Sequence, residues 1–106
     1  MTITEIIGKR EFEEAIKVDK PVLIDFMASW CAPCKLQTPI LKEFNQELVE
    51  KVKVYKLDVD QNSDIAAEYK VSSIPTLIVF LGGEEKARAV GLTTKAQLSD
   101  LIIKYL

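Results

Sequence analysis

Histidine is missing from this chain of 106 residues, and cysteine occurs only twice. Without histidine, the chain can build neither a histidine-based acid–base site nor a zinc site that mixes cysteine and histidine ligands. No apolar run approaches the roughly 20 residues that a membrane-crossing helix needs. The first five residues, Met1-Thr2-Ile3-Thr4-Glu5, lack the basic flank and apolar run of a signal peptide, so we expect a cytoplasmic protein.

A block of basic residues is also missing. The chain has 14 lysines and arginines against 16 acidic residues, and the two signs are interspersed. Neither nucleic acid nor a membrane surface is therefore an expected partner. Apolar residues make up 48% of the chain and charged residues 28%, which is typical of a globular protein. A chain of this length suits one core, so we expect residues 1–106 to form a single domain.

Strand-like and helix-like spacing of apolar residues alternates along the chain. Strands are expected at 3–7, 22–26, 52–59, 76–81 and 86–90, and helices at 10–17, from 33 to about 50, at 63–69 and from 93 or 94 onward. Thr94 and Gln97 have the spacing of a capping box for the last helix, whose buried stripe is predicted to run from Leu98 to Leu106. Such alternation implies an α/β fold with a mainly parallel sheet that ends in an antiparallel hairpin.

The two cysteines, Cys31 and Cys34, lie between an expected strand and an expected helix. A disulfide that closes so short a loop constrains the unfolded chain little, which favours a catalytic or metal-binding pair over a structural staple. Cys31 is predicted near the start of the helix, with Cys34 one turn inside. Free amide groups and the helix dipole stabilise an anion there, and a thiolate is the nucleophile in disulfide exchange.

The residues around the pair support this interpretation. Pro33 suits a first helical turn, where its missing N–H would have no partner, and with Ala32 it stiffens the loop. Trp30 supplies an apolar wall beside the reactive sulfur. Two alternatives remain open from these residues alone: a zinc site shared between two chains, and a pair of inert buried thiols.

The segment Trp30-Cys31-Ala32-Pro33-Cys34-Lys35 resembles the active-site motif of the thioredoxin family. The resemblance covers essentially the whole chain and includes Asp25-Phe26, Pro39, Lys56-Leu57-Asp58-Val59-Asp60, Ile74-Pro75-Thr76, Phe80, Gly82-Gly83-Glu84 and Val90-Gly91. It implies the thioredoxin fold, a central mixed sheet of five mainly parallel strands flanked by four helices. It also implies a protein dithiol–disulfide oxidoreductase that needs no cofactor beyond a reversible Cys31–Cys34 disulfide.

The chain departs from the family pattern at three places. Ala32 stands where the usual motif has glycine, Met27 where many members have a second tryptophan, and Ser72-Ser73 where some have Arg-Gly or a similar pair. These departures leave the reaction class unchanged. They leave open the exact reduction potential and the fit to a particular reductase.

Asp25 is the one charged residue in the apolar run 22–26. Such a carboxylate usually marks an exposed strand face, but a central strand is covered on both faces. Burial raises the pKa of a carboxyl group toward neutrality, where the group can exchange protons. The resemblance places Asp25 beneath Cys34, and it places Lys56 on the neighbouring strand, within reach through its long stem or a water. For Lys56 the alternative is an ordinary surface lysine.

The resemblance also implies a substrate groove beside the cysteines. From the residues alone, Pro75 is a strand-edge or turn proline and Gly91 a turn glycine. By resemblance, a cis Ile74–Pro75 bond faces the cysteines, the Ile74 backbone pairs with an extended substrate segment, and Gly91 permits close approach. The implied substrate-binding residues are Trp30, Ala32, Pro33, Ile74, Pro75, Val90 and Gly91.

The implied mechanism has two steps. Cys31 attacks a disulfide of a protein substrate, and Cys34 then releases the product with help from Asp25. The resemblance implies a monomer that is reduced again by a flavin-containing thioredoxin reductase. Two rival functions remain open: a thiol oxidase or isomerase in an oxidising compartment, and a binding subunit without enzymatic activity.

Overall fold

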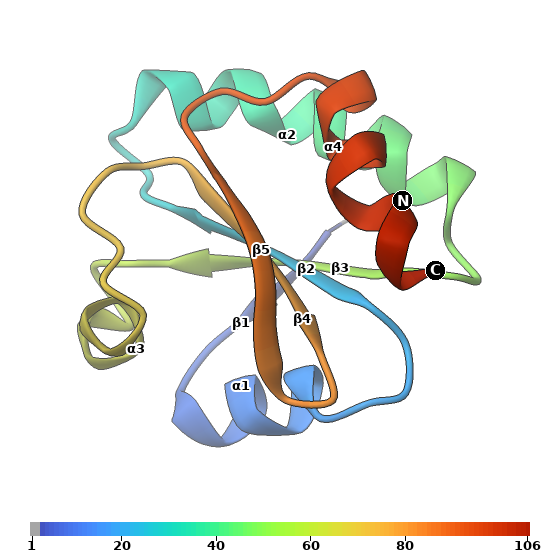
Figure 1. The fold of residues 1–106 in the computed structure, drawn as a ribbon. Coiled ribbons are helices and arrows are strands. Elements are labelled where there is room, and N and C mark those ends of the chain that lie inside the picture. Colours follow the sequence, from blue (N-terminus) through green and yellow to red (C-terminus); the bar gives the residue numbers. More distant parts are fainter. Residues whose placement is uncertain (1–2) are drawn as a thin grey trace.

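The computed structural model describes residues 3–106, and strands and helices alternate along them (Figure 1). Over this part of the chain the elements are β1 Thr4–Ile6, α1 Lys9–Ile16, β2 Val22–Met27, α2 Ala32–Glu47, β3 Lys53–Asp58, α3 Ser63–Glu68, β4 Thr76–Leu81, β5 Glu84–Val90, α4 Lys95–Ile102 and a short 3₁₀ turn, Ile103–Tyr105. Each predicted strand and helix is therefore present. Most boundaries differ from the expected ones by one to three residues.

The sheet has the strand order β1-β3-β2-β4-β5 over the described residues. β1 and β2 both pair with β3 in parallel, whereas β4 is antiparallel to β2 and to β5. The mixed five-stranded sheet is confirmed, and β2, which leads into the cysteines, lies at its centre. Because both edges of β2 are paired, its backbone is held on both sides, and the position where the chain leaves the sheet is fixed.

Helices cover both faces of the sheet (Figure 1). On one face, Leu41 and Phe44 of α2 and Leu98 of α4 pack against alternate residues of the strands, such as Leu23. On the other face, α1 and α3 pack through Phe12, Ile16, Ile65 and their neighbours. Successive strand residues point to opposite faces, so the nearly continuous apolar run of β2 is explained by burial on both sides.

The predicted capping box of α4 is confirmed. The hydroxyl of Thr94 accepts the backbone N–H of Gln97 at 3.1 Å, and the side chain of Gln97 accepts that of Thr94 at 2.9 Å. Such a cap stabilises a helix by about 1 kcal/mol. The predicted buried stripe is wrong at Leu106, which is 54% exposed, because α4 ends at Ile102 and a 3₁₀ turn changes the spacing.

β5 begins two residues earlier than expected. Gly82 and Gly83 both have positive φ, 62° and 85°, and they form a tight turn that lets pairing start at Glu84. Among residues 3–106, no helix combines the length and the apolar character needed to cross a bilayer.

Candidate active site

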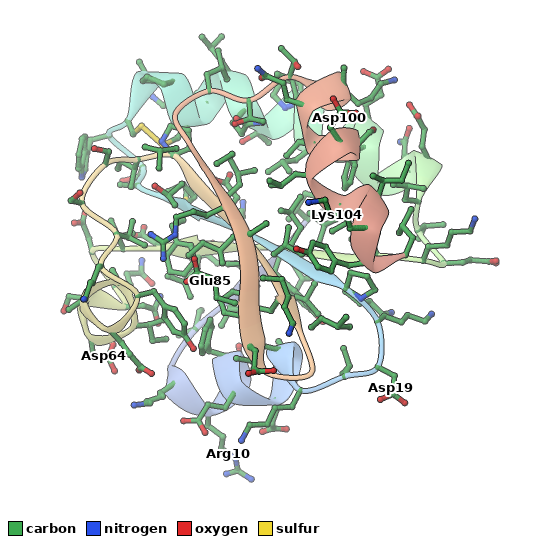
Figure 2. All side chains as sticks on the ribbon, viewed as in Figure 1. Arg10, Asp19, Asp64, Glu85, Asp100 and Lys104 are labelled. Carbon is green, nitrogen blue, oxygen red and sulfur yellow. A yellow bond between two sulfur atoms is a disulfide. The ribbon has the colours of Figure 1, made fainter. Side chains whose placement is uncertain are left out.

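The two cysteines are joined in a disulfide at the start of α2, which Figure 2 shows as a yellow bond. Cys31 is the N-cap of the helix, and its Sγ accepts the backbone N–H of Cys34 at 3.3 Å. Pro33 lies in the first turn, as predicted. In this oxidised state the sulfurs are bonded to each other, so they form a redox pair rather than a set of zinc ligands. After reduction, the same amide would face the Cys31 thiolate.

Solvent exposure does not distinguish the two sulfur-bearing residues. Cys31 is 4% exposed and Cys34 is 3% exposed, so the place of Cys31 at the helix start does not bring it nearer to solvent. Both pack against Ala28 and are bordered by Ile74. The difference between them is therefore electrostatic, because only the Cys31 sulfur receives a helix N–H.

Trp30 lies beside the pair and is 69% exposed. Its indole Nε1 donates a hydrogen bond to a carboxylate oxygen of Asp60 at 2.7 Å. Asp60 follows β3, and its own backbone N–H is held by the side chain of Asp58 at 2.8 Å. The ring is thus fixed in place while it stays open to solvent. Asp60 belongs to the segment 56–60 that matches the family pattern, but thirty positions separate it from Trp30, so no local pattern signals the contact.

Asp25 is buried, at 2% exposure, in the middle of β2. Its neighbours Ile24 and Phe26 point to the face of the sheet that packs against α1 and α3. Because successive strand residues point to opposite faces, the side chain of Asp25 lies on the face that α2 covers. One carboxylate oxygen has no hydrogen-bond partner among the described residues. Burial raises the pKa of Asp25 from 3.8 to about 7, and the attraction of Lys56 opposes this rise. The carboxyl therefore changes charge near neutral pH, and the exposed-face interpretation of Asp25 is wrong.

Lys56 is directly opposite Asp25 in the parallel register of β2 and β3. It is partly exposed, and the attraction of its charge lowers the pKa of Asp25. Its partial exposure and its effect on the buried carboxyl leave both interpretations of this residue open.

The Ile74–Pro75 peptide bond is cis, as the resemblance implies. It precedes β4 and brings the backbone of Ile74 to the disulfide, where the Ile74 carbonyl oxygen lies 3.8 Å from Cys31 Sγ. Thr76 closes this turn by donating its hydroxyl to the Ser73 carbonyl at 2.5 Å. An extended segment that paired with Ile74 would therefore lie across the Cys31 sulfur.

Val90 and Gly91 lie next to this turn. Val90 is 62% exposed, and the backbone N–H of Gly91 donates to the carbonyl of Pro75 at 2.7 Å. Gly91 has a φ of 89°, a backbone conformation that favours glycine. This supports the interpretation of Gly91 as a turn glycine. A Cβ at this position would meet nothing within 4 Å, so the space beside Gly91 is also open for another chain.

One buried polar residue of the site was missed. Gln37 is 0% exposed and bonds to the backbone of Thr93 in the loop after β5. Gln37 lies at helical spacing from Leu41 and Phe44, on the same buried side of α2. A glutamine within this apolar stripe is the sequence signal that indicates a buried polar contact.

Comparisons with known proteins agree with this geometry. The family model described as Thioredoxin matches residues 3–104. The chain is 48% identical over 92 residues to a thioredoxin of Rickettsia felis, with 87% of this chain and 88% of the relative covered. It is 44% identical over 106 residues to a thioredoxin of Alicyclobacillus acidocaldarius, with 96% and 97% covered. A solved Malassezia sympodialis thioredoxin has a TM-score of 0.90 and 32% identity, with 98% of this chain and 90% of that chain covered. These relatives favour the protein-disulfide reductase over the two rival functions.

Proposed function

Because the chain belongs to the thioredoxin family and is a protein-disulfide reductase with a redox-active Cys31–Cys34 pair, we propose distinct roles for the two sulfurs. Cys31 is the attacking nucleophile and Cys34 is the resolving thiol. The observation that carries this assignment is the contact between the Cys34 N–H and the Cys31 sulfur at the helix start.

The reaction takes place in two exchanges. In the first, the Cys31 thiolate attacks one sulfur of a substrate disulfide, and the other substrate sulfur leaves as a thiolate that takes up a proton. In the second, Cys34 loses its proton to Asp25 and attacks the Cys31 sulfur. The remaining substrate sulfur then leaves as a thiolate, so the substrate gains two electrons and the Cys31–Cys34 pair loses them.

Asp25 is the proposed proton acceptor for Cys34. The support is its burial on the face that α2 covers and a pKa of about 7, which lets it hold or release a proton at neutral pH. Lys56 is the proposed positioning charge that keeps the pKa of Asp25 from rising further. Its effect is electrostatic, because charge of opposite sign favours the ionised carboxyl.

The proposed substrates are disulfide-containing proteins that bind in an extended conformation beside the pair. The groove is built from three segments of the chain. Trp30, Ala32, Pro33 and Val90 are exposed, Ile74 and Gly91 are partly exposed, and Pro75 is buried beneath them. Backbone pairing with Ile74 supplies affinity that is independent of substrate sequence. The proposed electron donor is a flavin-containing thioredoxin reductase, and the proposed setting is the cytoplasm, where thiols are kept reduced.

Alkylation tests the assignment of the nucleophile. In the reduced protein at mildly acidic pH, iodoacetamide is expected to label Cys31 several times faster than Cys34, because the helix N–H that faces the Cys31 sulfur stabilises a thiolate there. Mass spectrometry of peptides at early times measures the ratio. Cys31→Ser is the control, since its single remaining thiol should react slowly, and faster labelling of Cys34 in the native chain would contradict the assignment.

Ala32 is expected to tune the reduction potential. It is exposed in the first turn of α2, and glycine there gains more backbone freedom than alanine when the disulfide opens. Ala32→Gly should therefore favour the reduced form and make the potential less negative by roughly 10–20 mV, from a helix preference of about 0.5–1 kcal/mol. Equilibration with glutathione measures the shift. Ala67→Gly, on an exposed position of α3, is the matched control and should leave the potential unchanged.

A further inference from the structure

Gln37 makes an unusual contact for a residue on the buried side of a helix. It lies one turn beyond Cys34 on α2 and is 0% exposed. Its side-chain Nε2 donates to the carbonyl of Thr93 at 2.9 Å, and its Oε1 accepts the N–H of the same residue at 2.8 Å. The side-chain amide of Gln37 thus bonds to both backbone polar groups of Thr93, its N–H and its carbonyl. The contact has one orientation only, because a reversed amide would place donor against donor.

Thr93 connects this contact to the proposed groove. The hydroxyl of Thr93 donates to the carbonyl of Gly91 at 2.9 Å, and the N–H of Gly91 donates to the carbonyl of Pro75 at 2.7 Å. Pro75 follows Ile74, whose carbonyl lies 3.8 Å from Cys31 Sγ. A continuous series of polar contacts therefore leads from α2 through the loop after β5 to the turn before β4 and back to the sulfur at the start of α2.

The segment that Gln37 holds carries exposed apolar side chains. Val90 is 62% exposed and Leu92 is 48% exposed, and they lie on either side of Gly91. A ligand that contacts the reacting sulfur and this segment together requires a fixed distance between α2 and the loop. The other polar contacts between α2 and this region are those of Lys95 with Glu43 and Glu47, which are exposed and lie further along the helix. Such surface pairs hold geometry weakly in comparison with a buried, fully satisfied contact.

We propose that Gln37 is a positioning residue for substrate recognition: through Thr93 it sets the place of the Val90–Gly91–Leu92 segment relative to the reacting sulfur, and so determines affinity for protein substrates without acting on the thiols. The inference rests on the groove described under the proposed function. If Gln37 acts in this way, protein substrates and small disulfides should respond differently to its replacement. A folded or extended protein needs the whole groove, whereas a small disulfide needs only the sulfur.

The test uses the full chain and two disulfides. Insulin is reduced in turnover with dithiothreitol as electron source, and 5,5′-dithiobis(2-nitrobenzoate) is reduced in a single turnover by the pre-reduced chain after dithiothreitol has been removed. Gln37→Met keeps the length and burial of the side chain and removes both hydrogen bonds. It is expected to raise KM for insulin about fivefold or more, since two net hydrogen bonds at Thr93 are lost, and to leave kcat close to that of the native chain. The rate with 5,5′-dithiobis(2-nitrobenzoate) and the reduction potential should both stay within error of native values.

Gln46→Met is the matched control, because it makes the same change on an exposed position of the same helix and should change none of these quantities. Gln37→Leu also removes both hydrogen bonds and remains apolar in this buried position, so it should raise KM for insulin in the same way. It also serves as the second variant if the methionine change prevents folding.

An unchanged KM for insulin in both Gln37 variants would overturn the inference and leave the roles of the cysteines intact. Equal losses with insulin and with the small disulfide, or a shifted potential, would overturn it as well, because they would show an effect on the fold or on the thiols. Failure of the native chain to reduce either disulfide would instead remove the proposed function itself.

Discussion

Cys34→Ser should hold a protein substrate covalently on Cys31 and lose all turnover above background. The attacking sulfur at the helix start is retained in this variant, together with the N–H of residue 34 that faces it. The first exchange can therefore take place, but no thiol is present to attack Cys31 in the second. With insulin as substrate, intact-mass spectrometry should detect the variant carrying one insulin chain, and dithiothreitol should release that chain.

Cys31→Ser is the control for this trap. It retains Cys34, which lies one turn inside the helix and lacks the N–H contact that the Cys31 sulfur has at the helix start, so it should capture little or no insulin under the same conditions. Capture of equal amounts by the two variants would contradict the order of attack. The comparison is informative because exposure is nearly the same at the two positions, so a difference in capture reports chemistry rather than access.

Asp25→Ala should make the oxidised protein more stable at pH 8 and slow the resolving step. Folding raises the pKa of Asp25 from 3.8 to about 7 because burial penalises the carboxylate. Between these values the folded state keeps a proton that the unfolded state releases. The contribution of Asp25 to the free energy of unfolding is therefore greatest below pH 4, falls as the pH rises, and is lost above pH 7, a change of about 4 kcal/mol in total.

Denaturant unfolding of the oxidised protein from pH 4 to pH 8 measures this effect. The native chain should lose up to about 1.4 kcal/mol per pH unit relative to Asp25→Ala, so the variant becomes the more stable of the two as the pH rises. The small cavity left by the carboxyl group reduces the gain at pH 8 but not its dependence on pH. A difference that stays constant across the range would show that Asp25 keeps its ordinary pKa when folded.

The kinetic half of the prediction uses the same variant. Release of the mixed disulfide should be slower for Asp25→Ala near pH 7, because Cys34 no longer has a proton acceptor, and the deficit should shrink at higher pH, where the thiol ionises unaided. Because a proton is expected to pass between Asp25 and Cys34, the profile gives apparent values for the interacting groups together rather than for one residue. Lys56→Met should move the stability profile to higher pH, since the charge of Lys56 lowers the pKa of Asp25.

The fold and much of the site could be predicted from the chain because they depend on patterns that are local in sequence. The apolar run around Asp25 indicates a strand covered on both faces, and the burial of Asp25 follows from it. The order Trp30 to Lys35 between a strand and a helix indicates a sulfur at a helix start. Thr94 and Gln97 identify the beginning of α4 through a contact only three positions long.

The remainder depends on contacts between distant positions, which such patterns do not encode. Gln37 and Thr93 are 56 positions apart, and Trp30 and Asp60 are 30 apart, so only the folded chain brings them together. The prediction that Leu106 is buried is wrong for a different reason. The prediction extends the α-helical spacing of residues 98–102 to Leu106. After Ile102 the chain tightens into a 3₁₀ turn, so that spacing no longer places Leu106 on the buried side.

Reduction of insulin by dithiothreitol tests the central claim most directly. The claim is that the Cys31–Cys34 pair reduces protein disulfides, with Cys31 as the attacking sulfur. Precipitation of the free insulin B chain, followed by turbidity, should be much faster with the native chain than with dithiothreitol alone. With Cys31→Ser the rate should equal that of dithiothreitol alone. A Cys31→Ser variant that accelerates precipitation as well as the native chain would contradict the claim.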